Sequence, residues 1–142
     1  MASRFWEAKA GRAFVGRIDT GSDLVEEIER FCAEQSIVAA QVTVVGAMRR
    51  IRYAFYEQAE KRYRELESDT HRELTSFVGN VSLRDGSPFL HAHASFADAD
   101  GGTIGGHILR GCELFVGEVM IRELGDVSLV RLHDEETGLA LW

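Results

Sequence analysis

Hydrophobic and polar positions alternate near the start of the chain. Within residues 6–18, Phe14 and Ile18 share one parity, while Val15 and Arg17 occupy the other. Alternation with a period of two is typical of a sheet strand. Polar and glycine residues follow directly, so we predict a strand that ends at this point.

The clearest helix is predicted over residues 23–35. Leu24, Ile28 and Phe31 recur at the spacing of one helix face, which gives an amphipathic helix with an apolar stripe. Asp23 starts a capping-box pattern that ends at Glu26. The charged residues predicted to face away from the stripe are Glu26, Glu27, Glu29, Arg30 and Glu34. The stripe needs a partner, and the simplest partner is a sheet face.

The rest of the chain shows the two-residue period and the turn residues of an antiparallel sheet. Further strands are predicted over residues 38–45, 49–56, 74–83, 89–96, 103–109, 114–124 and 127–132, with residues 139–142 as a last edge strand. Residues 57–66 have the propensity for a short helix, but we favour a turn followed by a strand. We therefore predict an α+β fold, with a mainly antiparallel sheet of about seven strands and one principal flanking helix.

Composition fits a single globular domain over residues 1–142, since the chain is 45% hydrophobic and 27% charged. It lacks the run of about 18 apolar residues that crosses a bilayer. Arg4, Glu7 and Lys9 stand where a signal peptide needs an apolar stretch. We expect a cytoplasmic protein with no membrane partner.

Net charge argues against general binding to nucleic acid. The chain has 16 basic and 23 acidic residues, a formal charge of -7, which repels a phosphate backbone. Arg49, Arg50 and Arg52 form a local exception, because they lie among aromatic residues in a pattern that can contact phosphates. The alternative, which we favour, is that these side chains only make an exposed hairpin soluble.

Motifs for several other chemistries are incomplete. Cys32 and Cys112 are far apart and form neither a metal knuckle nor a disulfide framework, so we expect buried free thiols. Residues 11–16 have the glycine spacing of a phosphate loop without its lysine and hydroxyl. Residues 98–109 begin like a calcium loop but lack its final glutamate.

Three histidines are placed so that they can converge on one ion. His91 and His93 are two residues apart in a predicted strand, where they share a face with Cα atoms about 6.5 Å apart. His107 lies on the partner strand, after two glycines that leave room near the backbone. Three neutral imidazoles with an open fourth position suit Zn²⁺, although nickel, cobalt and iron accept the same ligands. The alternative is that these are solvated side chains on an exposed sheet face.

The remaining candidate side chains are isolated. His71 and His133 have charged neighbours, and we expect both at the surface. Glu118 lies in an otherwise apolar strand, where it either faces a pocket or faces solvent, and we favour solvent because a buried carboxylate needs a partner.

Several short motifs follow one another in a fixed order in the second half of the chain. They are Gly-Asn-Val-Ser at residues 79–82, Asp-Gly at 85–86, Pro88, His-Ala-His at 91–93, Asp-Gly at 100–101, Gly-Gly-His at 105–107, Glu-Val at 118–119 and Ile121. Together with the strand over residues 12–18 and the helix over residues 24–32, this order resembles the PPC domain, the plant and prokaryote conserved domain. The resemblance extends to about residue 132.

The resemblance implies an antiparallel sheet with a flanking helix, assembled as a homotrimer. In stand-alone prokaryotic members it also implies a metal held by the motif histidines, which match His91, His93 and His107. Asn80 and Glu118 belong to the same motifs and are the candidate pocket residues. Plant relatives use AT-hooks on DNA, but this sequence has no Arg-Gly-Arg-Pro hook, so the element that enters the minor groove is missing.

Two functions remain open from the sequence. The first is a homotrimer with a three-histidine metal site, catalytic or structural, that is open to water or a small anionic ligand. The second is a regulatory module that binds nucleic acid or a protein partner through the trimer surface.

Overall fold

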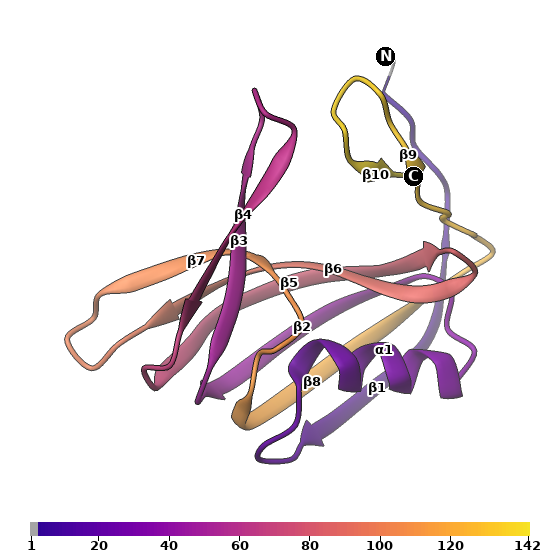
Figure 1. Cartoon of the computed structure of the whole chain (residues 1–142). Coiled ribbons are helices and arrows are strands. Elements are labelled where there is room, and N and C mark those ends of the chain that lie inside the picture. Colours follow the sequence, from indigo (N-terminus) through magenta and orange to yellow (C-terminus); the bar gives the residue numbers. More distant parts are fainter. Residues whose placement is uncertain (1–2) are drawn as a thin grey trace.

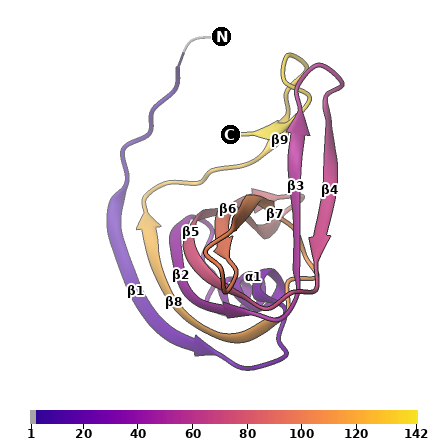
Figure 2. The same ribbon diagram turned by 90° about the vertical axis from the view of Figure 1, so that its left-hand side faces the viewer.

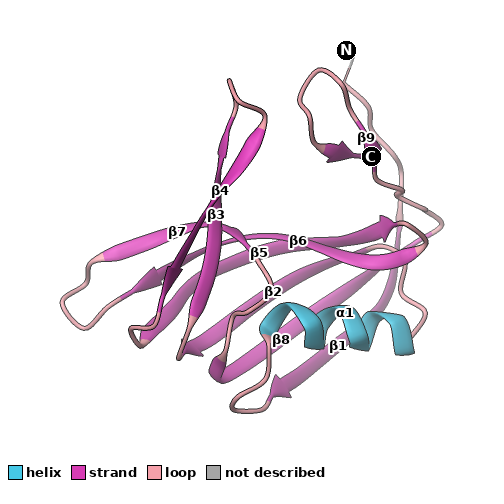
Figure 3. Ribbon diagram, in the orientation of Figure 1, coloured by secondary structure: helices cyan, strands magenta, loops and turns pink. Residues whose placement is uncertain are grey.

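The computed structural model describes residues 3–142, in which a large antiparallel sheet carries a single helix on one face (Figures 1 and 3). The helix is α1 (Leu24–Glu34). The eight strands of the sheet are β1 (Lys9–Ile18), β2 (Ala40–Met48), β3 (Ile51–Glu57), β4 (Arg62–Ser68), β5 (Arg72–Arg84), β6 (Ser87–Ala97), β7 (Thr103–Ile108) and β8 (Leu114–Gly125). Their order is β1-β8-β2-β5-β6-β7-β3-β4. The α+β prediction is therefore confirmed. None of the described helical residues form a segment long and apolar enough to span a membrane.

Helix α1 begins and packs as its sequence predicts. The Asp23 carboxylate accepts hydrogen bonds from the backbone N–H groups of Val25 and Glu26, at 2.9 and 3.0 Å, which satisfies free donors of the first turn. Leu24 and Ile28 are buried in the core formed with the sheet. Figure 2 shows that the sheet curls around the helix.

Glu29 is buried, although the helix pattern predicts it on the polar side that faces away from the apolar stripe. Its exposed fraction is only 8%. Its carboxylate accepts the backbone N–H of Leu90 at 2.9 Å and pairs with the guanidinium of Arg110. The prediction that Glu29 faces solvent is wrong because the curled sheet covers more of the helix than its apolar stripe.

The turn-plus-strand prediction for residues 57–66 is confirmed by β4, and the predicted 89–96 and 103–109 hairpin is confirmed by the β6–β7 pairing. The predicted strand over residues 127–132 is wrong. This segment crosses the end of β5, where Leu83 donates to the Leu129 carbonyl and accepts from the Arg131 N–H, both at 2.8 Å. The alternating apolar residues of this segment lie at the end of the sheet without forming a ladder of paired residues. Strand pairing resumes only in the short hairpin of β9 (Leu132–His133) and β10 (Ala140–Leu141).

Two hairpins project from the body of the sheet, one from its β3–β4 end and one formed by the separate strands β9 and β10. The β3–β4 hairpin and the β9–β10 hairpin project in the same direction (Figure 1). Tyr56 Oη donates to the Thr137 carbonyl at 2.6 Å, and Lys61 Nζ donates to the Glu135 carbonyl at 2.7 Å. These two bonds tie the hairpins together.

Candidate metal centre

The three predicted histidines meet on neighbouring strands. His91 and His93 lie on β6, and His107 lies on β7 directly opposite His93 in the register. One ring nitrogen from each side chain can be chosen so that all three lie within 4.8 Å of one another. The ring centroids are 5.2 to 5.5 Å apart. The imidazoles therefore share a face and converge on a common point.

Two glycines set the close approach of β7 to its neighbours. A Cβ atom on Gly105 would lie 2.3 Å from the Ala94 carbonyl oxygen, and one on Gly106 would lie 2.6 Å from the Ala54 carbonyl oxygen. Neither distance is possible between real atoms, so a side chain at either position would push β7 away. The glycines thus hold the backbone of His107 close to β6 and β3.

Burial keeps two of the three imidazoles neutral. It lowers the pKa of His91 to about 4, with Arg131 and His93 adding to the effect. It also lowers the pKa of His107 to about 4, with His91, His93 and Arg131 adding. At neutral pH both rings therefore have a free lone pair, which is the form that binds a metal ion.

One nitrogen of the site lacks a partner. His107 is 9% exposed, and its Nδ1 atom is buried without a hydrogen bond. A buried polar atom of this kind costs free energy unless something binds it. This orphaned nitrogen and the three converging nitrogen donors fit a divalent ion that accepts imidazole ligands.

Aromatic residues of the β3–β4 hairpin fix the His107 ring. Tyr63 stacks on it, with centroids 4.7 Å apart and planes 26° apart. Tyr56 supports Tyr63 edge-on at 4.8 Å. Nothing local in the sequence places Tyr63 at this site, because the contact depends on the path of a hairpin distant in the sequence.

Arg131 is a second residue that sequence analysis missed. Its Nη2 atom lies 3.4 Å from His91 Nδ1 and donates to Asn80 Oδ1 at 2.9 Å. Asn80 lies on β5 opposite His91, so this candidate pocket residue does lie beside the histidines. The available signal was a single charge among the apolar residues of segment 127–132.

The other candidates lie away from the histidines. Glu118 is exposed on β8, opposite Val45 of β2, and β8 is separated from β6 by β2 and β5. His71 and His133 are exposed, as expected. Both cysteines are buried free thiols, also as expected.

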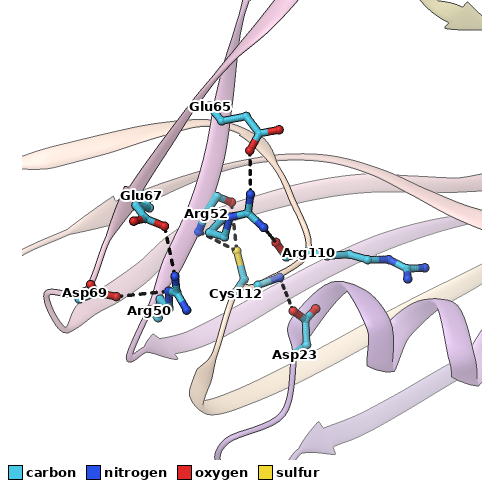
Figure 4. A network of polar contacts seen from close by, with 9 residues as sticks. Asp23, Arg50, Arg52, Glu65, Glu67, Asp69, Arg110 and Cys112 are labelled. Atoms are coloured by element: carbon cyan, nitrogen blue, oxygen red, sulfur yellow. Dashed lines mark hydrogen bonds and ion pairs between the residues drawn. The ribbon is translucent and has the colours of Figure 1, made fainter.

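The arginines of the local basic cluster are paired with carboxylates, and Figure 4 shows the pairs made by Arg50 and Arg52. Arg49 pairs with Glu113 at 3.5 Å, Arg50 with Glu67 at 3.2 Å and Asp69 at 3.3 Å, and Arg52 with Glu65 at 2.7 Å. These acidic neighbours reduce the positive potential that a phosphate backbone would meet.

The chain matches a known protein family over most of its length. The profile of the Plants and Prokaryotes Conserved domain, abbreviated PCC or PPC, matches residues 6–125. The chain belongs to this family.

Solved structures of relatives share the fold across their whole length. A metal-containing protein from Archaeoglobus fulgidus has a TM-score of 0.95 and 38% sequence identity, with 99% of both chains covered. A PPC protein from Pyrococcus horikoshii has a TM-score of 0.93 and 32% identity, over 99% of this chain and 96% of its own. A protein from Bacteroides thetaiotaomicron, provisionally named as DNA-binding, has a TM-score of 0.84 at 20% identity, over 94% of this chain and 95% of its own, and shows the fold alone.

Two curated relatives are much longer proteins. Both are called Bifunctional protein GlmU, from two Synechococcus strains, and each is 29% identical to this chain, over 129 and 123 residues. The matches cover 89% and 86% of this chain and 20% and 18% of the relatives, so the chain spans about a fifth of the curated relatives it matches.

Proposed function

We propose that residues 1–142 form one PPC domain that assembles as a homotrimer and binds a divalent metal ion, zinc, through His91, His93 and His107. The observation that carries this proposal is the convergence of three nitrogen donors within 4.8 Å. The 38% identical protein from Archaeoglobus fulgidus is metal-containing, which supports the same role here.

Tyr63 and Arg131 lie beside two of the three histidines. His91, His93 and His107 would hold the ion and would leave one position open to water or a small ligand, toward which zinc would supply Lewis-acid chemistry. Tyr63 holds the His107 ring in place by stacking. Arg131 brings a positive charge next to His91, so a ligand with negative charge is favoured at the open position.

The face of the sheet turned away from α1, which we call the outer face, supports self-association. Val15, Met120, Thr43 and Val78 form one row across it by strand register. The three apolar side chains of this row are 81%, 64% and 59% exposed, in the order Val15, Met120 and Val78. An apolar row of this kind on a sheet is typical of a surface that another subunit covers.

Elemental analysis of protein purified without a histidine tag tests the metal site. We expect one ion per chain in the wild type and little or none in the His91→Ala, His93→Ala double variant. The matched control is His71→Ala, His133→Ala, which removes two exposed histidines outside the cluster. Equal metal content in all three proteins contradicts the proposal.

Light scattering during size exclusion tests the assembly. A homotrimer has three times the chain mass of 15.8 kDa, and Met120→Glu should lower the measured mass because it places a charge in the apolar row. Glu67→Gln, which leaves the outer-face row unchanged, serves as the control. A wild-type mass equal to one chain contradicts the trimer.

A further inference from the structure

Arg131 is a buried cation whose partners are all neutral. Its exposed fraction is 8%. Its guanidinium donates to Ser82 Oγ at 2.8 Å, to the Ala140 carbonyl at 3.0 Å and to Asn80 Oδ1 at 2.9 Å. Among residues 3–142, no carboxylate lies within 4.0 Å of Arg131, the distance that defines an ion pair. A buried charge without a counterion is costly, so this site favours an anion from outside the chain.

A second arginine, Arg84, lies over the same aromatic ring as Arg131. Arg131 and Arg84 both lie over the Phe89 ring, at 5.5 and 5.2 Å from its centroid. The carboxylate paired with Arg84 is Asp85 at 3.9 Å, whose side chain is 97% exposed, and such a surface pair is weak. Burial and the charge of Arg84 lower the pKa of Arg131. The two like charges therefore repel each other in the absence of an anion.

Arg84 and Arg131 both line a small cavity of about 100 Å³. His91 and His107 form part of its wall, and Leu139 and Leu141 are among its apolar residues. No carboxylate of the described chain lines it. Its volume equals the share of about three water molecules, which admits only a small ligand.

We propose that this cavity binds the carboxylate of a short-chain organic acid. The guanidinium groups of Arg84 and Arg131 neutralise and hydrogen-bond the carboxylate, and the apolar residues contact the hydrocarbon end. A carboxylate fits better than inorganic phosphate because part of the lining is apolar. The histidines border the cavity, so the acid is the ligand that would meet the metal ion. This last point rests on the proposed function, whereas the anion site itself rests on the arginines.

Titration of the metal-free full chain with sodium propionate, at constant ionic strength against sodium chloride, tests the site. Trp142 reports binding by fluorescence, because its ring lies 5.9 Å from the Arg131 guanidinium. We expect a saturable change at millimolar propionate and a loss of about tenfold or more in affinity for Arg131→Met, since charge-assisted hydrogen bonds are lost. Inorganic phosphate should bind more weakly than propionate.

Arg84→Met is a second test variant, needed because Arg131→Met replaces a buried side chain and a folding defect would also abolish binding. The Arg84 side chain is half exposed, so its replacement leaves the core unchanged. It should weaken propionate at least about threefold, whereas Arg50→Met, a surface arginine outside the cavity, should leave affinity unchanged. Absence of saturable binding, equal affinity in Arg84→Met and wild type, or tighter binding of phosphate would each overturn the proposal.

The same titration in His93→Ala, which removes a proposed metal ligand that does not line the cavity, separates this inference from the metal site. Loss of metal content with retained propionate binding supports both proposals. If the wild type carries no metal but still binds propionate, only the proposed metal function fails.

Discussion

Replacing Glu29 with alanine tests how helix α1 is joined to the strand that carries two of the histidines. Glu29 accepts the backbone N–H of Leu90 at 2.9 Å, and Leu90 directly precedes His91. Alanine leaves this N–H buried without a partner, which costs about 1–3 kcal/mol. It also removes the ion pair with Arg110, whose side chain is 62% exposed and which therefore contributes at most about 1 kcal/mol. We expect a loss of about 2–3 kcal/mol in the free energy of unfolding.

Urea unfolding followed by circular dichroism measures this loss, with the slope against denaturant as a check on two-state behaviour. Glu29→Gln keeps an oxygen that can accept the Leu90 N–H, so it should lose less than about 1 kcal/mol. Glu26→Ala is the matched control, because Glu26 lies 3.8 Å from the same arginine with a side chain that is 59% exposed. The reasoning is refuted if Glu29→Ala is as stable as Glu26→Ala, or if glutamine is as costly as alanine.

The buried cysteines, the histidine pKa values and the glycines of β7 give three further predictions. Cys32 and Cys112 are buried, and the pKa of each thiol is raised to about 11. Neither thiol should therefore react with a thiol reagent at pH 8 until the protein unfolds. Rapid labelling of the native protein contradicts this prediction. In metal-free protein, the pKa values of His91 and His107 are lowered from 6.5 to about 4. The free energy of unfolding should therefore stay constant above pH 6.5 and fall as the pH drops from 6.5 to 4, because the unfolded chain binds more protons than the folded chain in that range. Urea midpoints across this range should fall less steeply in His91→Asn than in the wild type, and an equal slope in both proteins contradicts the prediction. Gly105→Ala should push β7 from β6 and weaken metal binding more than about tenfold by calorimetric titration, since a displacement of about 1 Å spoils ligand geometry. Gly125→Ala, where an added Cβ would make only ordinary contacts with Lys9 at 3.6 and 3.9 Å, should leave metal affinity unchanged.

The helix and the histidine hairpin could be predicted because their signals are local. Asp23 caps a helix whose apolar residues recur at a regular spacing. In the turn after β6, Asp98 accepts the backbone N–H of Gly102 at 2.7 Å, so the turn that brings His93 opposite His107 is encoded within a few residues. Period and turn chemistry are enough at such places.

The surroundings of the site could not be predicted, because they depend on the curvature of the sheet and on contacts between distant segments. Arg131 lies 51 positions from Asn80 in the sequence, yet the two side chains are hydrogen-bonded. Glu29 has the helix position of a surface residue but is covered by the curled sheet. Tyr63 reaches His107 only because the β3–β4 hairpin stands over β7. Alternation in a single strand carries no information about these long-range arrangements.

The most direct test of the metal centre is anomalous diffraction from crystals of tag-free protein, recorded on both sides of the absorption edge of the zinc ion. We expect one anomalous peak per chain, about 2.0–2.1 Å from a nitrogen of each of His91, His93 and His107. A peak elsewhere in the molecule, or a zinc-supplemented crystal without a peak between these three rings, contradicts it.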